Sequence, residues 1–117
     1  MRTLLLTTMV LCWASLAQAE LLLMRFGANY CPSCRQMVGV FNDADVQAKL
    51  TENKINMSYA KADVDGTRLF DKYQVTTIPF MMLLDHDPET NRAKLIRKTQ
   101  QGQTLSKDAT LRFLTPP

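Results

Sequence analysis

Two cysteines lie where an apolar segment gives way to a helical pattern. Residues 21–26 are almost continuously apolar and lead through a short turn to Cys31, which Pro32 and Ser33 separate from Cys34. A continuous apolar run of this length is typical of a strand covered on both faces, as in a parallel or mixed α/β sheet. A Cys-x-x-Cys pair at such a strand-to-helix junction indicates redox chemistry.

The position of the pair suits thiol–disulfide exchange. The first turn of a helix has unsatisfied N–H groups and a dipole that favours negative charge, so a thiolate at Cys31 would be stabilised. Pro32 is tolerated at the first helical position because its missing N–H would have no partner there. Cys34 would lie one turn further in and more buried, where it can attack a mixed disulfide formed at Cys31.

Other roles for the cysteines remain open. They could be small buried hydrophobic residues, or they could bind metal, although a closed zinc site needs four ligands. The single histidine, His86, falls in a charged turn and is expected to be solvated. Several methionines could offer sulfur to copper, but they fall at strand and helix positions where core packing is expected: Met24, Met37, Met57, Met81 and Met82. We therefore expect no metal and no other cofactor.

Residues 1–19 match a secretory signal peptide. They have a positive start, a mainly apolar run over 4–16, and the small-x-small pattern Ala-Gln-Ala at 17–19. The apolar run is shorter than the about 20 residues of a membrane-spanning helix, and an uncleaved anchor is the alternative. We expect cleavage, export to the periplasm or another extracytoplasmic space, and one domain over 20–117.

Export would leave an unusual set of cysteines. Of the three in the chain, Cys12 would leave with the signal, so only Cys31 and Cys34 would remain. Small exported domains usually use disulfides to close long loops. A disulfide between Cys31 and Cys34 would enclose only two residues and stabilise the fold little, so we expect the pair to be reactive. The formal charge of +3 is spread without a Lys/Arg block, and no nucleic-acid partner is expected.

The remaining hydrophobic pattern predicts an α/β domain in the order β-α-β-α-β-β-α. Ile78 precedes Pro79 and is pushed out of helical geometry, which indicates a turn before the next strand. Residues 85–91 are rich in turn formers and predict a hairpin. Expected strands cover 21–26, 55–64, 80–84 and 93–98, and expected helices cover 34–41, 44–50, 67–73 and 105–114.

Ordered motifs make the chain resemble the thioredoxin superfamily, in particular its exported thioredoxin-like members. The motifs are Phe26-x-Ala28-x-Tyr30-Cys31-Pro32-Ser33-Cys34, Tyr59-Ala60-Lys61-Ala62-Asp63-Val64-Asp65 and Tyr73-x-Val75-x-x-Ile78-Pro79. The stretch Phe41-x-Asp43-x-x-Val46-Gln47-x-x-Leu50 is similar to thioredoxin-like domains of periplasmic electron transfer. The resemblance implies a shortened thioredoxin-like α/β fold, with a four-stranded mixed sheet flanked by helices and without the family's first strand and helix.

The resemblance also implies roles for individual residues. Cys31 would attack, Cys34 would resolve, and together they would form the redox disulfide. Ile78–Pro79 would be a cis peptide facing the cysteines, with the Ile78 backbone pairing with a client peptide. The substrate-binding residues would be Tyr30, Pro32, Ile78 and Pro79. The implied partners are cysteine-containing exported client proteins and a membrane-embedded thiol electron donor, and the protein is expected to be a monomer.

The chain departs from the family near the cysteines. Arg25 stands where thioredoxins have a buried acid that assists proton transfer, and Lys61 matches a lysine nearby; both are expected to modulate thiol pKa values. Gly27 and Tyr30 replace two tryptophans. Tyr30-Cys31-Pro32-x-Cys34 is also similar to glutaredoxins, but their Gly-Gly pair is absent here, which disfavours glutathione binding.

The sequence thus predicts an exported thiol–disulfide oxidoreductase. In the strongly oxidising members of the family that the chain resembles, a histidine between the cysteines stabilises the reduced thiolate. No histidine lies there in this sequence, so the resemblance favours a reductant or electron relay over a primary oxidant. Two other functions remain open. One is a redox-inactive client-binding or assembly module of the same fold, and the other is a copper-handling protein that uses Cys31, Cys34 and a methionine.

Overall fold

A four-stranded mixed sheet forms the centre of the structure, a computed structural model that describes residues 20–116. Strands β1 (Glu20–Gly27), β2 (Ile55–Lys61), β3 (Phe80–Asp87) and β4 (Arg92–Lys98) lie in the order β2-β1-β3-β4. β1 is parallel to β2 and antiparallel to β3, and β4 is antiparallel to β3. The predicted four-stranded mixed sheet is confirmed.

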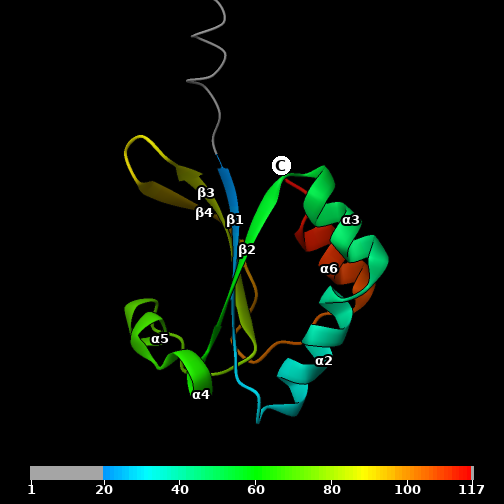
Figure 1. Ribbon diagram of the computed structural model, residues 1–117, viewed down its shortest axis with the longest axis vertical. Coiled ribbons are helices and arrows are strands. Elements are labelled where there is room, and N and C mark those ends of the chain that lie inside the picture. The colour runs from blue at the N-terminus through cyan, green and yellow to red at the C-terminus, as the bar shows by residue number, and fades with distance from the viewer. Residues whose placement is uncertain (1–19, 117) are drawn as a thin grey trace, which may run out of the picture.

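Helices cover both faces of this sheet. In Figure 1, α2 (Pro32–Phe41), α3 (Ala44–Glu52) and α6 (Lys107–Phe113) lie on one side, and α4 (Ala62–Asp65) and α5 (Arg68–Lys72) lie on the other. Both layers are required because the central strands β1 and β3 are buried along most of their length, and strands buried on both faces need cover on both. The sequence pattern does not predict α4.

Alternate residues of β1 supply two hydrophobic cores. Leu23 belongs to the core under α2, α3 and α6, whereas Met24 and Phe26 belong to the core on the side of α5. Successive side chains of a strand point to opposite faces, so Arg25 points to the same face as Leu23. A charged side chain is therefore carried into the layer between the sheet and α2.

The second strand differs from the prediction at its end and along its buried side. It stops at Lys61, not at residue 64, because the chain turns into α4 and the Asp65 carboxylate accepts the Lys61 N–H at 2.8 Å. Met57, expected among the inward residues, is 42% exposed. The reason is that β2 is an edge strand of the sheet, so the helices above the centre of the sheet cover this side chain only in part.

His86 lies in β3, not in a charged turn. β3 continues to Asp87, so the turn of the hairpin is shorter than expected. His86 is half-buried opposite Glu20 of β1, with Nδ1 3.6 Å from Glu20 Oε2 and Nε2 3.0 Å from Asn91 Oδ1. The hydrogen bond to Asn91, followed by the Glu20 carboxylate, raises the pKa of His86.

We expect His86 to stabilise the fold more in mild acid than in mild base. A pKa raised in the folded state contributes stability that is fully present below the unfolded pKa of about 6.5 and is lost as the pH rises through the folded pKa. We expect urea unfolding to give wild type a larger free energy of unfolding than His86→Gln at about pH 5.5, and this difference should shrink at about pH 8.5. An equal difference between the two proteins at both pH values would contradict this.

The expected signal peptide, with Cys12, lies outside the described residues. Among residues 20–116, no helix is long and apolar enough to cross a membrane. Cleavage after residue 19 and the start of the domain at residue 20 stay predictions.

Candidate redox site

Cys31 and Cys34 form a disulfide at the start of α2, with their Cα atoms 5.2 Å apart. Cys31 is the N-cap of the helix, Pro32 opens its first turn, and the Cys34 N–H donates to Cys31 Sγ at 3.2 Å. This N–H belongs to the group that a helix leaves without a backbone partner. It can therefore stabilise negative charge on Cys31 when the disulfide is reduced.

The two cysteines differ in exposure. Cys34 is 1% exposed and lies on the buried face of α2 with Met37, whereas Cys31 is half-buried. Beside Cys31, the side chains of Tyr30 and Pro32 are exposed. A client disulfide can therefore reach Cys31 more easily than Cys34, which fits the expected order of an attacking and a resolving cysteine.

The turn before Cys31 is fixed by hydrogen bonds from two directions. The Asn29 N–H donates to both carboxylate oxygens of Asp63 at 3.1 Å, which ties the turn to α4. Arg35 Nη1 donates to the Asn29 carbonyl at 3.1 Å, and the Cys31 N–H donates to the Ala28 carbonyl at 3.3 Å. These contacts fix the backbone that leads into Cys31.

The peptide bond between Ile78 and Pro79 is cis, as the resemblance implies. Gln101 holds the preceding loop, since its Oε1 accepts the Thr76 N–H at 2.7 Å and its Nε2 donates to the Gln74 carbonyl at 3.0 Å. Within residues 20–116, neither the N–H nor the C=O of Ile78 bonds to another backbone group. Both groups are free to pair with an added peptide strand.

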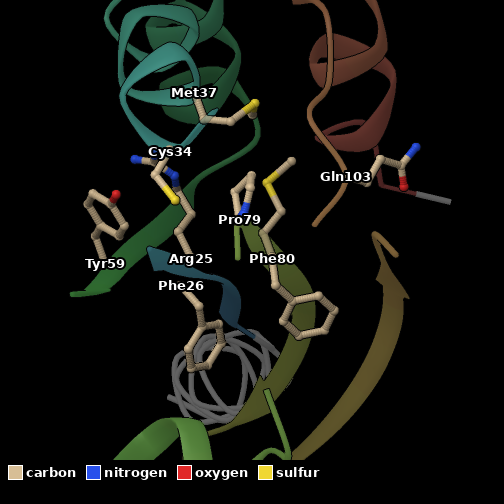
Figure 2. A pocket seen from close by; sticks show the side chains of 9 residues that line it. Arg25, Phe26, Cys34, Met37, Tyr59, Pro79, Phe80 and Gln103 are labelled. Atoms are coloured by element: carbon tan, nitrogen blue, oxygen red, sulfur yellow. The ribbon is translucent and has the colours of Figure 1, made fainter. Parts of the chain in front are cut away.

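A small pocket opens beside Cys34 (Figure 2). Its walls come from β1, α2, β2, the cis-proline loop, β3 and the segment before α6: Arg25, Phe26, Cys34, Met37, Tyr59, Pro79, Phe80, Met81 and Gln103. The structure thus brings together Arg25, Cys34 and Pro79 from the predicted site. Lys61 is not among the lining residues, and its Nζ lies 5.9 Å from the centre of the Tyr59 ring.

Arg25 forms part of this wall and is 6% exposed. Its guanidinium carbon lies 4.0 Å from the centre of the Phe41 ring and 4.3 Å from that of Tyr59, and its Nη1 lies 3.9 Å from Met57 Sδ. Burial lowers the pKa of Arg25 and Tyr59 partly offsets this, but an arginine side chain stays protonated in proteins. Two aromatic rings therefore hold a permanent cation beside the pocket.

A model of the thioredoxin family matches residues 12–109, most of the chain. The chain belongs to the thioredoxin family. The four-stranded sheet and its flanking helices therefore form a thioredoxin-like α/β fold, as predicted. Family membership and the Cys31–Cys34 disulfide together support thiol–disulfide oxidoreductase chemistry in general.

Solved structures agree with this fold. A thioredoxin from Thermus thermophilus is 22% identical with a TM-score of 0.64, over 81% of this chain and 71% of that one. A disulphide isomerase from Xylella fastidiosa Temecula1 is 18% identical with a TM-score of 0.60, over 81% and 78%. Thioredoxin-2 of a malaria parasite is 14% identical with a TM-score of 0.61, over 83% and 82%. No curated protein sequence matches this thioredoxin-family chain.

Sequence reasoning assigned no site role to Tyr59, Gln101 or Gln103. Tyr59 pairs with Arg25 across the parallel strands β1 and β2, and an alignment of the two predicted strands could have placed it beside the arginine. The glutamines lie in an irregular segment after β4, where no periodicity connects residue type with position. The sequence holds no signal that would have found them.

The copper hypothesis stays a prediction. Within residues 20–116, no group of three or more His, Cys, Asp or Glu side chains could hold a metal ion. Met37 and Met81 do line the pocket with Cys34, but Met37 Sδ accepts the Leu105 N–H at 3.3 Å. The expected core role is observed for the buried methionines Met24, Met37, Met81 and Met82, and not for Met57.

Proposed function

We propose that this protein is an exported thiol–disulfide oxidoreductase that acts as a reductant or electron relay on cysteine-containing client proteins. The observation that carries the proposal is the geometry of the cysteine pair. An accessible Cys31 caps α2 and is bonded to the buried Cys34, which lines a pocket together with Pro79; within residues 20–116 the N–H and C=O of Ile78 have no backbone partner. A client peptide added at Ile78 would bring its sulfur to Cys31.

The proposed reaction is an exchange of two electrons. The Cys31 thiolate attacks a client disulfide, forms a mixed disulfide and releases one client thiolate. The Cys34 thiolate then attacks Cys31 Sγ, breaks the mixed disulfide and releases the second client thiolate. The protons that Cys31 and Cys34 lose to solvent balance those that the client thiolates take up. The client gains two electrons as the protein dithiol becomes a disulfide.

Export and the partners rest on the sequence. Residues 1–19 have the pattern of a signal peptide, and glutathione and thioredoxin do not supply electrons to an oxidising compartment. A membrane-embedded thiol donor would therefore return electrons to Cys31. The proposed localisation is tested by fractionating expressing cells, where a shortened protein in the extracytoplasmic fraction is expected.

The proposal predicts that the purified protein catalyses reduction of insulin disulfides by dithiothreitol. Insulin turbidity should appear sooner with the protein than with dithiothreitol alone, and the Cys31–Cys34 couple should have a reduction potential near or below about −250 mV. A potential near about −120 mV would instead indicate an oxidant. Client binding without insulin reduction would favour the assembly module, and stoichiometric Cu(I) binding that blocks thiol labelling would favour copper handling.

A further inference from the structure

Arg25 is a buried cation. Among residues 20–116 no carboxylate forms an ion pair with it, and residues 1–19 contain no Asp or Glu. Two aromatic rings and a thioether surround its guanidinium. The attraction of a cation to aromatic rings and a thioether is weaker than the hydration free energy that the cation loses on burial. An anion that formed in the same pocket would therefore be strongly favoured.

The pocket contains a thiol that can become such an anion. Cys34 is 1% exposed and lines the pocket together with Arg25. Figure 2 shows the Arg25 side chain extending from β1 towards the start of α2, where Cys34 lies. In the disulfide Cys34 is neutral, but in the dithiol it must lose its proton before it can attack a mixed disulfide.

We propose that the Arg25 guanidinium is the counter-ion of the Cys34 thiolate and prepares it for the resolving step. The inference rests on the proposed function, because only an exchange reaction requires Cys34 to ionise. In that step the Cys34 thiol gives its proton to solvent at the pocket mouth. The resulting thiolate bonds to Cys31 Sγ, the bond between Cys31 and the client sulfur breaks, and the client leaves as a thiolate that takes up a proton. Arg25 gains and loses no atom.

The other charged groups near Cys34 do not take this role. On β2, the Tyr59 ring contacts the Arg25 guanidinium, and the Lys61 ammonium lies over the same ring without lining the pocket. On α2, Arg35 is exposed and donates to the Asn29 carbonyl. The cis-proline loop, β3 and the segment before α6 contribute only uncharged lining residues. Arg25 is thus the lining residue with a fixed charge among residues 20–116.

A counter-ion for Cys34 has a second consequence, for the redox equilibrium. Arg25 stabilises the reduced protein only when Cys34 is ionised, so it makes the couple more oxidising above the Cys34 pKa and has no effect well below it. Within the proposed function, this favours an electron relay over a strong reductant. A residue needed only for folding would not produce such a dependence on pH.

The test is a titration of Cys34 in a Cys31→Ser background, followed by thiolate absorbance. Burial in apolar surroundings alone raises a thiol pKa above about 8.5, whereas an arginine counter-ion lowers it by about 1 unit or more. We expect a Cys34 pKa below the ordinary value, an increase of about tenfold in the proton affinity with Arg25→Met, and recovery with Arg25→Lys. Lys61→Met, which removes a cation outside the pocket, is the matched control and should change little.

Reduction potentials of the proteins with both cysteines give an independent result. At alkaline pH, Arg25→Met should lower the reduction potential of the Cys31–Cys34 couple by about 30 mV, which corresponds to a tenfold change in the equilibrium constant. In acid, the potentials of wild type and Arg25→Met should be equal. A Cys34 pKa above the ordinary value in the Cys31→Ser protein overturns the proposal even if the Arg25 variants fail to fold. If insulin is reduced but the Cys34 pKa does not change in the Arg25 variants, this inference fails while the proposed function stands. If the Cys34 pKa does change but insulin is not reduced, Arg25 is the counter-ion of Cys34 and the proposed function fails.

Discussion

Cys31→Ser is expected to lower insulin reduction to the rate of dithiothreitol alone. Cys31 is the accessible member of the pair and the N-cap of α2, where the Cys34 N–H already donates to its sulfur. A serine can accept the same N–H, so the helix start should persist while the nucleophile is lost. The measurement is insulin turbidity with wild type and Cys31→Ser at equal concentration, together with urea unfolding of both reduced proteins.

The buried position of Cys34 predicts a different result for Cys34→Ser. This variant keeps the nucleophile and loses the group that releases the client, so mixed disulfides with clients should accumulate in expressing cells. They should be visible as bands that disappear on reduction. The experiment is best made in a Cys12→Ser background, in which no third thiol can form the adducts. Adducts that are equally abundant with Cys31→Ser would show that the assignment of the two cysteines is wrong.

The contrast between the cysteines and Arg25 shows what a sequence pattern can predict. Strand, turn and helix around Cys31 and Cys34 follow from residues close in the chain, whose periodicity is visible. The surroundings of Arg25 depend on which residues of β2 stand beside it, and the register pairs it with Tyr59. A shift of that register by one residue would present the opposite face of β2, and no local signal determines it.

Edge positions and side-chain hydrogen bonds account for the other differences. Met57 has the alternating pattern of an inward residue, yet β2 is an edge strand and leaves it 42% exposed. The end of β2 depends on the Asp65 carboxylate, which accepts the Lys61 N–H. Gln101 shapes the loop before Pro79 through contacts across more than twenty residues of chain. Hydrophobic periodicity carries no information about such polar contacts.

Phe26→Ala is expected to be among the most destabilising substitutions in the chain, by about 3–5 kcal/mol of unfolding free energy. Phe26 is 1% exposed and packs against the rings of Phe70, Tyr73 and Phe80, with centroid distances of 5.1, 6.0 and 5.8 Å. These rings join the central strand to α5 and to the start of β3, so a cavity there cannot close by moving one side chain. Urea unfolding of the oxidised protein, followed by far-UV circular dichroism, measures the change.

The matched control is Tyr30→Ala, which also deletes an aromatic ring. Tyr30 is 67% exposed, and surface substitutions usually change stability by less than about 0.5 kcal/mol. The side chain of Phe26 packs in the core with Phe70 and Phe80, so its loss should weaken the attachment of α5 to the sheet. A loss of stability no greater than that of Tyr30→Ala would mean that the aromatic cluster is not the main support of α5.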